Sequence, residues 1–176
     1  MTTTSDASAS AFDPTGLRPV STVEHVQISR LMNRYADAVV HRNGEQWASC
    51  WADEAVWDLG GGRLVEGKEA IVKLWYAAMG GMAAVVQTVH NGDAWYEEGR
   101  EDRAVGRWAI SERFLTANGV RALLLAEYLD GFVKSNGEWL FSRRLLRPHY
   151  QGPADLSGDF RNTRSSLEGL GESPDV

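Results

Sequence analysis

Four long segments of alternating apolar and polar residues fill the second half of the chain and constrain its fold more than any other feature. They run from about residue 84 to residue 151, and the dipeptides Asn118-Gly119 and Asn136-Gly137 join the last three. Alternation with period two is typical of a half-buried β-strand, and Asn-Gly is the strongest short hairpin signal. The pattern therefore predicts an antiparallel meander of four long strands.

The first half of the chain shows helical spacing instead. Ser21 and Glu24 have the spacing of a capping box, and apolar residues then recur at helical intervals through about residue 41. The elements expected next are a short helix at 44–51, a strand at 55–59, a hairpin or loop at 60–67 and a helix at 67–79. Helices followed by a meander predict an α+β fold, with helices packed on one face of a curved sheet. Such a sheet forms a cone whose interior can hold a ligand.

The length and the composition of the two ends indicate one folded unit. A chain of 176 residues can fill one core but not two. Residues 1–20 are rich in Thr, Ser and Ala and are expected to be disordered, and residues 152–176 are expected to form a flexible tail. In that tail, Leu156 and Phe160 are candidates for docking on the domain or on a neighbour. The folded domain is predicted at 21–151.

Composition excludes several classes of protein. The formal net charge of −6 and the lack of a Lys/Arg cluster argue against nucleic acid as a partner. The sequence has no apolar run of the roughly 20 residues that a membrane span needs, and its N-terminus lacks the pattern of a secretory signal. The single cysteine, Cys50, excludes an internal disulfide and is expected to be a core residue. We therefore expect a cytoplasmic protein with no membrane partner.

No motif indicates a metal or a nucleotide. The four histidines are scattered, without the spacing of a metal site, and no metal is expected. The glycines at 60–62 lack the Lys-Ser/Thr ending of a phosphate-binding loop, and no G-x-S-x-G nucleophile motif occurs.

The segment GRWAISERFLT at 106–116 has one residue that does not fit its strand pattern. Trp108, Ile110 and Phe114 share the apolar face, and Glu112 lies on that face with them. A buried carboxylate costs several kcal/mol unless it is paired or protonated, and such groups are tolerated most readily at working sites. Glu112 is therefore either a structural ion-pair partner, of Arg147 or Arg143, or a functional acid.

Two further polar residues are candidates for the same face. In the first long strand, Val86, Thr88, His90 and Ala94 are interpreted as facing inward. In the last strand the inward set is interpreted to include Arg147, with the members Trp139, Phe141, Leu145, Arg147 and His149. The opposite register stays open for both strands, because both of their faces are mixed.

Several stretches together resemble the SnoaL-like family of the nuclear transport factor 2-like superfamily. They are RYADAVVHRNGEQWASCWADEAVWDLGGGRLVEGKEAI, TVHNGD, AVGRWAISERFL and NGEWLFSRRLLRPHY, and the resemblance covers about residues 22–150. It implies the cone-shaped fold of that superfamily, whose members include bile acid 7α-dehydratase, scytalone dehydratase and ketosteroid isomerase.

The resemblance implies a site made of a helix tyrosine, a strand histidine, an acidic residue and an arginine. The matching positions are Tyr35, His90, Glu112 and Arg147. Many relatives also carry an aspartate five residues after the tyrosine, which pairs with the histidine, but here that position is Val40. Asp37 is the preferred substitute, and His41 is the other. If neither reaches His90, Glu112 inherits the role.

These residues predict acid/base chemistry without a cofactor. A histidine is a suitable base near neutral pH, and a buried carboxylic acid can donate a proton. Arg147 and Tyr35 are expected to bind a substrate oxygen as negative charge develops on it. The predicted function is a dehydratase-type lyase or an isomerase acting on a hydrophobic, ring-containing molecule. The expected substrate-binding residues are Trp57, Trp75, Met79, Met82 and Trp108.

Two alternative functions stay open. The first is a non-catalytic small-molecule-binding protein or a subunit like the β subunit of ring-hydroxylating dioxygenases. The second, an epoxide hydrolase, ranks last because an Arg-x-Asp element is missing. Leu123, Leu125 and Leu129 are expected on the outer face of the sheet, where they favour a homotrimer or a homodimer.

Overall fold

The long N-terminal helix begins where the capping box predicts. In the computed structural model, which describes residues 13–60 and 62–160, helix α1 spans Thr22–His41. The Ser21 hydroxyl accepts a hydrogen bond from the Glu24 backbone N–H at 3.3 Å, which satisfies one of the free donors of the first turn. The helix ends at Arg42, whose φ of 54° is left-handed. The prediction for this helix is confirmed.

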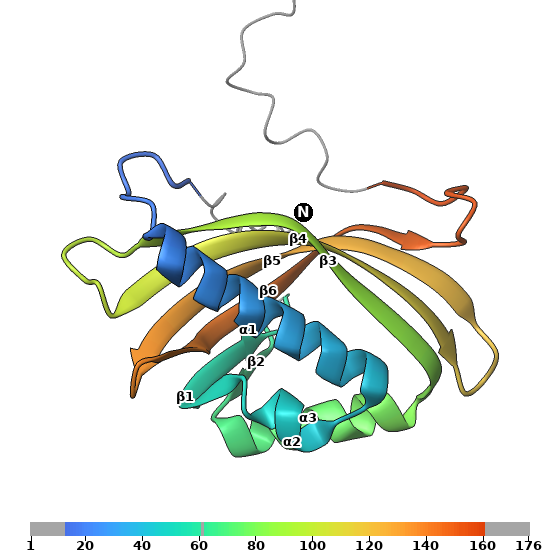
Figure 1. The fold of residues 1–176 in the computed structure, drawn as a ribbon. Helices are drawn as coiled ribbons and strands as arrows, with labels where there is room; N and C mark the ends of the chain where they lie inside the picture. Colours follow the sequence, from blue (N-terminus) through green and yellow to red (C-terminus); the bar gives the residue numbers. More distant parts are fainter. Residues whose placement is uncertain (1–12, 61, 161–176) are drawn as a thin grey trace, which may run out of the picture.

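The remaining elements follow the predicted order. They are α2 (Gly44–Ala48), β1 (Trp51–Asp58), β2 (Leu64–Glu66), α3 (Lys68–Gly80), β3 (Met82–Tyr96), β4 (Arg103–Thr116), β5 (Arg121–Ser135) and β6 (Glu138–Gly152). The six strands form one mixed sheet in the order β2-β1-β6-β5-β4-β3, in which only β1 and β6 pair in parallel (Figure 1). The four long strands are the predicted antiparallel meander.

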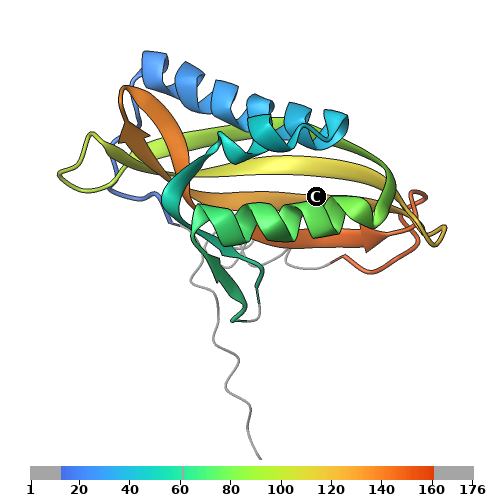
Figure 2. The ribbon, with the colours of Figure 1, turned by 90° about the horizontal axis from the view of Figure 1, so that it is seen from below.

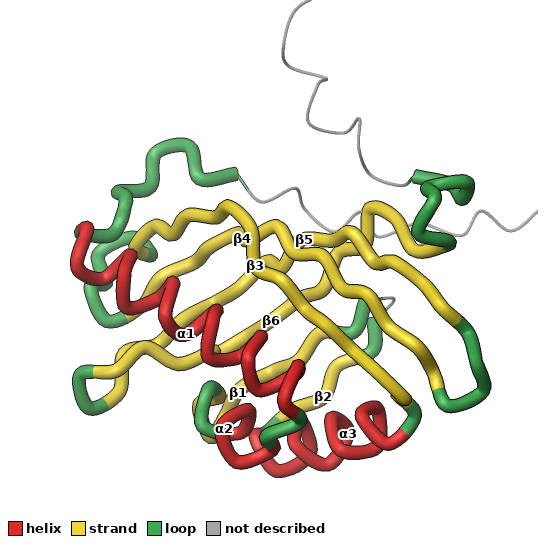
Figure 3. Tube along the Cα trace, turned by 45° about the vertical axis from the view of Figure 1, so that its right-hand side comes forward, coloured by secondary structure: helices red, strands yellow, loops and turns green. Residues whose placement is uncertain are grey.

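The helices lie on one side of the curved sheet. The sheet arches over them, with α1 crossing beneath the long strands and with α2 and α3 below β1 (Figures 1 and 3). Seen from the helical side, α1 and α3 both lie in front of the sheet (Figure 2). We call the face that packs against the helices the concave face and the opposite one the outer face. This architecture is the predicted α+β fold, with helices packed on one face of a curved sheet.

One-residue irregularities in β3 and β6 decide which side chains reach the concave face. The pairing of β3 with β4 shifts between Val89 and Gly92, and the pairing of β6 with β5 shifts at Ser142, between Phe141 and Arg143. A β-bulge of this kind reverses the alternation of side chains beyond it. The inward parity of each strand therefore differs on the two sides of this bulge. A second shift occurs near one end of each strand, between Met82 and Ala84 in β3 and between Pro148 and Tyr150 in β6.

Tryptophans fill the space between the helices and the sheet. Trp47 of α2 stacks on Trp75 of α3 with ring centroids 5.0 Å apart, and it contacts Trp51 and Trp57 of β1 at 5.3 and 5.6 Å. Trp47, Trp51 and Trp75 are at most 2 % exposed. Aromatic side chains bury more area than any others, so this cluster holds the two short helices against the sheet.

Both ends of the described chain lie against the sheet. The backbone N–H of Val20 donates to Ala94, and that of Tyr96 donates to Arg18, so residues 18–20 extend the sheet beside β3. These residues belong to the segment that the sequence analysis expects to be disordered. At the other end, Phe160 packs on Tyr150 with centroids 4.8 Å apart, as its apolar character led us to expect. Residues 1–12 and 161–176 lie outside the described residues.

Candidate functional site

Three polar side chains meet on the concave face of β3, β4 and β5. Gln87 lies opposite Glu112 in the pairing of β3 with β4, and its Nε2 donates to the Glu112 carboxylate at 2.8 Å and to the Tyr128 hydroxyl oxygen at 3.2 Å. Gln87 and Tyr128 are buried, and Glu112 is partly buried. The Oε1 atom of Gln87 is buried and has no hydrogen-bond partner within the described chain.

Burial changes the ionisation of this group. It raises the pKa of the Glu112 carboxyl above its ordinary value, and the hydrogen bond from Gln87 opposes the rise only in part. Burial also raises the pKa of Tyr128 well above its ordinary value, with a further contribution from the neighbouring Tyr35. Glu112 can therefore hold or release a proton at a higher pH than an exposed glutamate, while Tyr128 stays a donor.

A buried ion pair lies deeper on the same face. Arg144 of β6 donates to both carboxylate oxygens of Asp130 of β5, at 2.8 Å from Nε and 2.7 Å from Nη2. Both side chains are 0 % exposed. Burial alone would lower the pKa of Arg144, but Asp130 raises it above its ordinary value, so the guanidinium is charged.

Aromatic rings enclose that guanidinium. Its carbon lies 3.7 Å from the ring centre of Tyr128, 3.9 Å from that of Phe141 and 4.2 Å from that of Tyr35. Cations are stabilised over aromatic faces, more so when desolvated. Tyr35 is thus on the concave face, as predicted, and it lies beside Tyr128 with ring centroids 5.9 Å apart.

Two of the predicted site residues lie on the wrong face of the sheet for that site. His90 is exposed on the outer face, where its Nε2 lies 2.9 Å from the Ser111 hydroxyl. Arg147 pairs with Glu127 on the same outer face. The predicted inward register was wrong for both, because the bulges after Val89 and at Ser142 reverse the parity. Tyr35 and Glu112 therefore meet Gln87 and Arg144, not His90 and Arg147.

The predicted substitute for the missing aspartate does not reach a strand histidine. Asp37 is exposed on α1, where it contacts His41 at 3.1 Å and accepts a hydrogen bond from Gln46 at 2.8 Å. His41, the other substitute, is held in that contact. Neither residue lies with His90, whose described partner is Ser111.

The apolar residues predicted to bind substrate lie in three kinds of place. Trp75 and Trp108 are core residues, each 2 % exposed, and Trp57 and Met79 pack against that core while partly buried. Met82 lies at the beginning of β3, where its backbone carbonyl accepts a hydrogen bond from Arg42. Their role in binding stays a prediction.

We call Tyr35, Gln87, Glu112, Tyr128, Asp130 and Arg144 the concave cluster. Four of its residues were not predicted from the sequence: Gln87, Tyr128, Asp130 and Arg144. Asp130 and Arg144 each stand within apolar strand segments, which is the signal that singled out Glu112. Arg143 and Arg147 lie close to Arg144 in the sequence, and counting alternate residues along the strand assigned the inward position to Arg147 instead. Gln87 carries no charge and gave no signal.

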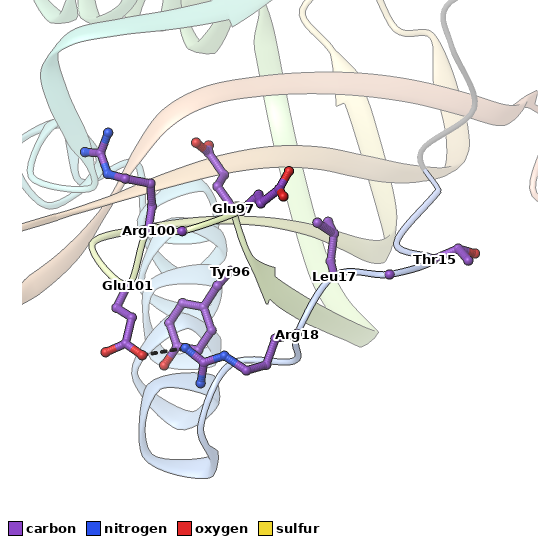
Figure 4. Close-up of a pocket in the computed structure, with 10 residues that line it drawn as sticks. Thr15, Leu17, Arg18, Tyr96, Glu97, Arg100 and Glu101 are labelled. Atoms are coloured by element: carbon purple, nitrogen blue, oxygen red, sulfur yellow. Dashed lines mark hydrogen bonds and ion pairs between the residues drawn. The ribbon is translucent and has the colours of Figure 1, made fainter.

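A surface pocket of about 610 Å³ lies away from this cluster, between residues 15–18 and the turn after β3. Arg18 lies 4.2 Å from the centre of the Tyr96 ring and forms an ion pair of 2.5 Å with Glu101 (Figure 4). This ion pair and the backbone hydrogen bonds of Arg18 and Val20 with β3 hold the N-terminal segment against the sheet. No group of three or more His, Cys, Asp or Glu suited to a metal ion occurs in the described ranges 13–60 and 62–160. No helix among these residues is long and apolar enough to cross a membrane.

The raised pKa of Glu112 predicts that the stability difference between Glu112→Gln and the parent protein depends on pH. Because the pKa of Glu112 is higher in the folded protein than in the unfolded chain, ionisation of this carboxyl destabilises the folded state. This destabilisation is absent below the ordinary glutamate pKa and grows as the pH rises from that value through the raised one. Glu112→Gln removes this effect while it keeps an acceptor for Gln87. Its stability relative to the parent protein is expected to increase from pH 4 to pH 8, and each kcal/mol raises Tm by about 2–4 °C.

Thermal unfolding at several pH values would measure this difference. Glu54→Gln removes an exposed carboxylate from β1 and is the matched control. A Glu112→Gln difference that is flat across the pH range would contradict the raised pKa.

The helices on one face of a curved, mixed six-stranded sheet have the arrangement of the nuclear transport factor 2-like superfamily. A family model described as the SnoaL-like domain matches residues 21–145, so the chain belongs to the SnoaL-like family. That match confirms the resemblance inferred from the sequence. No protein of curated function matches the chain in sequence.

Solved structures show the same fold at low identity. A hexachlorocyclohexane dehydrochlorinase, LinA type 2, is 20% identical, with a TM-score of 0.66 and coverage of 80% of this chain and 93% of that one. A protein from Novosphingobium aromaticivorans, whose assignment as a scytalone dehydratase is itself provisional, is 19% identical, with a TM-score of 0.69 and coverage of 81% and 95%. A Mycobacterium tuberculosis protein of unknown function is 23% identical, with a TM-score of 0.63 and coverage of 84% of both chains. These likenesses show the fold alone.

Proposed function

We propose that the chain is a cofactor-independent lyase or isomerase that uses Glu112 to move a proton on a hydrophobic, ring-containing small molecule. Its structural neighbours include a dehydrochlorinase, which is a lyase by name. The roles that the sequence analysis gave to His90 and Arg147 are not part of this proposal, since both residues lie on the outer face.

The observation that carries the proposal is the contrast between two concave carboxyl groups. Asp130 is locked in an ion pair with Arg144, whereas the partner of Glu112 is the neutral amide of Gln87. Burial raises the pKa of both carboxyl groups, but of the two only Asp130 has a counter-charge, so Glu112 is the one suited to taking up and returning a proton. Glu112 is therefore the group on this face that is free to act as acid and base.

One carboxyl group is enough for the chemistry. Ionised Glu112 removes a proton from the carbon next to a substrate carbonyl, and the electron pair of that C–H bond forms an enolate. The Tyr128 hydroxyl, which keeps its proton, stabilises the enolate oxygen. Protonated Glu112 then returns its proton either to a departing hydroxyl group, which leaves as water, or to another carbon of the enolate. The first outcome is dehydration and the second is isomerisation.

Deuterium exchange tests the proposal without knowledge of the natural substrate. The protein is incubated in D₂O with a panel of steroid and bicyclic ketones, and mass spectrometry measures deuterium incorporated next to the carbonyl. We expect catalysed exchange with at least one ketone, and a loss of about 10²–10⁴-fold in Glu112→Gln.

The control for this experiment is His90→Gln, which is expected to keep the parent exchange rate because His90 lies on the outer face. Exchange that survives in Glu112→Gln but is lost in His90→Gln would overturn the assignment. Absence of exchange with every ketone would overturn the proposed activity.

A non-catalytic small-molecule-binding protein is the second candidate, and one observation favours it. The concave positions of β3 beside Glu112 and Ile110 hold Gln87 and Val89, neither of which can act as a base. This candidate predicts that ketones of the same panel raise Tm without any exchange. The same measurements therefore separate the two functions.

We also propose that copies of the chain associate through the outer face. Leu123, Leu125 and Leu129 lie there in register with Gly152, Tyr150 and Leu145 of β6, as the sequence analysis expects. Leu123 is already buried within the chain, whereas Leu125 and Leu129 are partly exposed, and the predicted homotrimer or homodimer would cover these two. Light scattering that gives the mass of one chain would contradict it, and co-purification with a larger partner chain would favour a subunit of the dioxygenase β type.

A further inference from the structure

A groove of about 250 Å³ lies between the flank of α1 and the turn that joins β5 to β6. Its α1 wall carries Gln27, Arg30 and Arg34, spaced three and four residues apart, and its other wall is formed by residues 137–139. Side chains at such spacing share one face of a helix. The groove shares no lining residue with the concave cluster, whose α1 residue is Tyr35.

The groove is positively charged on an acidic protein. The Arg30 side chain is exposed and has no ion pair or hydrogen bond with any other described residue. The Nε atom of Arg34 is buried, and no described group accepts its hydrogen bond. The carboxylate that lines the groove belongs to the exposed Glu138. The two positive charges of Arg30 and Arg34 therefore outnumber the one negative charge in the groove, that of Glu138.

The floor of the groove combines apolar surface with one further donor. Leu31 and Trp139 both line it, and each is 2 % exposed. The indole Nε1 of Trp139 is buried without a hydrogen-bond partner in the described chain. A buried N–H that lacks an acceptor is costly, so an acceptor on a ligand would stabilise it.

We propose that this groove is a binding site for a small aromatic carboxylate. A guanidinium group binds both oxygens of a carboxylate through parallel N–H donors, which would use the free Nε of Arg34. Leu31 and the Trp139 ring then contact the apolar body of the ligand. The volume suits a ligand of this size, since a cavity of about 150 Å³ holds benzene.

Binding of benzoate tests the proposal directly. Calorimetry is expected to show one benzoate per chain, and the indole N–H signal of Trp139, assigned with Trp139→Phe, is expected to shift in ¹⁵N–¹H spectra. Arg30→Gln should weaken binding by about 10-fold and the double variant with Arg34→Gln by about 100-fold, because each removes a charged hydrogen bond. Lys73→Gln on the exposed side of α3 is the matched control and should bind as the parent does.

Neutral and inorganic probes complete the experiment. Benzamide, which has the same shape without the charge, should bind at least about 10-fold more weakly than benzoate, and inorganic phosphate should compete poorly because it makes no use of the apolar floor. Equal binding of benzamide or of phosphate would overturn the proposal, as would unchanged binding in the double arginine variant. Arg30→Gln changes only an exposed side chain, so its result stands even if Arg34→Gln unfolds. The outcome is independent of the Glu112 chemistry.

Discussion

Replacing Arg144 with methionine is expected to destabilise the protein by about 3–5 kcal/mol, because it leaves the Asp130 carboxylate buried without a counter-charge. Asp130 accepts both of its hydrogen bonds from this guanidinium, and both side chains are 0 % exposed. The substitution also removes the cation from between the rings of Tyr35 and Tyr128. Urea unfolding followed by tryptophan fluorescence would measure the loss.

The adjacent arginine offers a matched control. Arg143 pairs with Asp58 at 2.7 Å, but its side chain is 57 % exposed, so Arg143→Met should cost less than about 1 kcal/mol. The double substitution Arg144→Met with Asp130→Leu should recover most of the stability, since it removes both charges together. If the double variant were no more stable than Arg144→Met, the uncompensated charge would not be the cause.

The change Gly92→Ala is expected to cost about 3 kcal/mol, near the upper end for overpacking a core. A Cβ atom at Gly92 would lie 2.3–2.4 Å from three ring atoms of Trp108, which is itself 2 % exposed. The indole has little room to move, because its ring lies 5.9 Å from that of Phe132 and 6.1 Å from that of His25 on α1. The same unfolding measurement would detect the loss.

Gly80→Ala is the control for this change. A Cβ at Gly80, in the last turn of α3, would meet nothing within 4 Å, so the substitution should be neutral or slightly stabilising. A Gly92→Ala protein as stable as the parent would mean that Trp108 does not pack against β3 in solution.

The order and type of the elements could be predicted from the sequence because each signal is local. The capping box at Ser21 and the period-two segments act within a few residues, and the turn at Asn136-Gly137 has the positive φ angles, 51° and 84°, that this dipeptide adopts readily. The face of β4 was also predicted, since that strand has no bulge over residues 103–115 and Glu112 stays in phase with Trp108.

The composition of the site could not be predicted to the same degree. Parity is counted along a strand, so one inserted residue reverses every assignment beyond it. In β3 the predicted inward face is correct for Ala94, which lies beyond the bulge. Before the bulge the parity is reversed, so Gln87 faces inward and was missed. In β6 the predicted inward face is correct for Phe141, which lies before the bulge at Ser142. Beyond that bulge the parity is reversed, so Arg144 faces inward and Arg147 faces outward. A bulge depends on the neighbouring strand, which the sequence of one strand does not reveal.

The pairing of residues 18–20 with β3 has a consequence for self-association of the sheet. β3 is the last strand of the order, and an unpaired strand edge is a template on which a foreign strand can add. Residues 18–20 occupy the backbone groups of Ala94 and Tyr96, and the Pro19 ring brings no N–H of its own to the outside. Residues 18–20, of which Val20 also joins the core, thus block the addition of a foreign strand at the end of β3 that they cover.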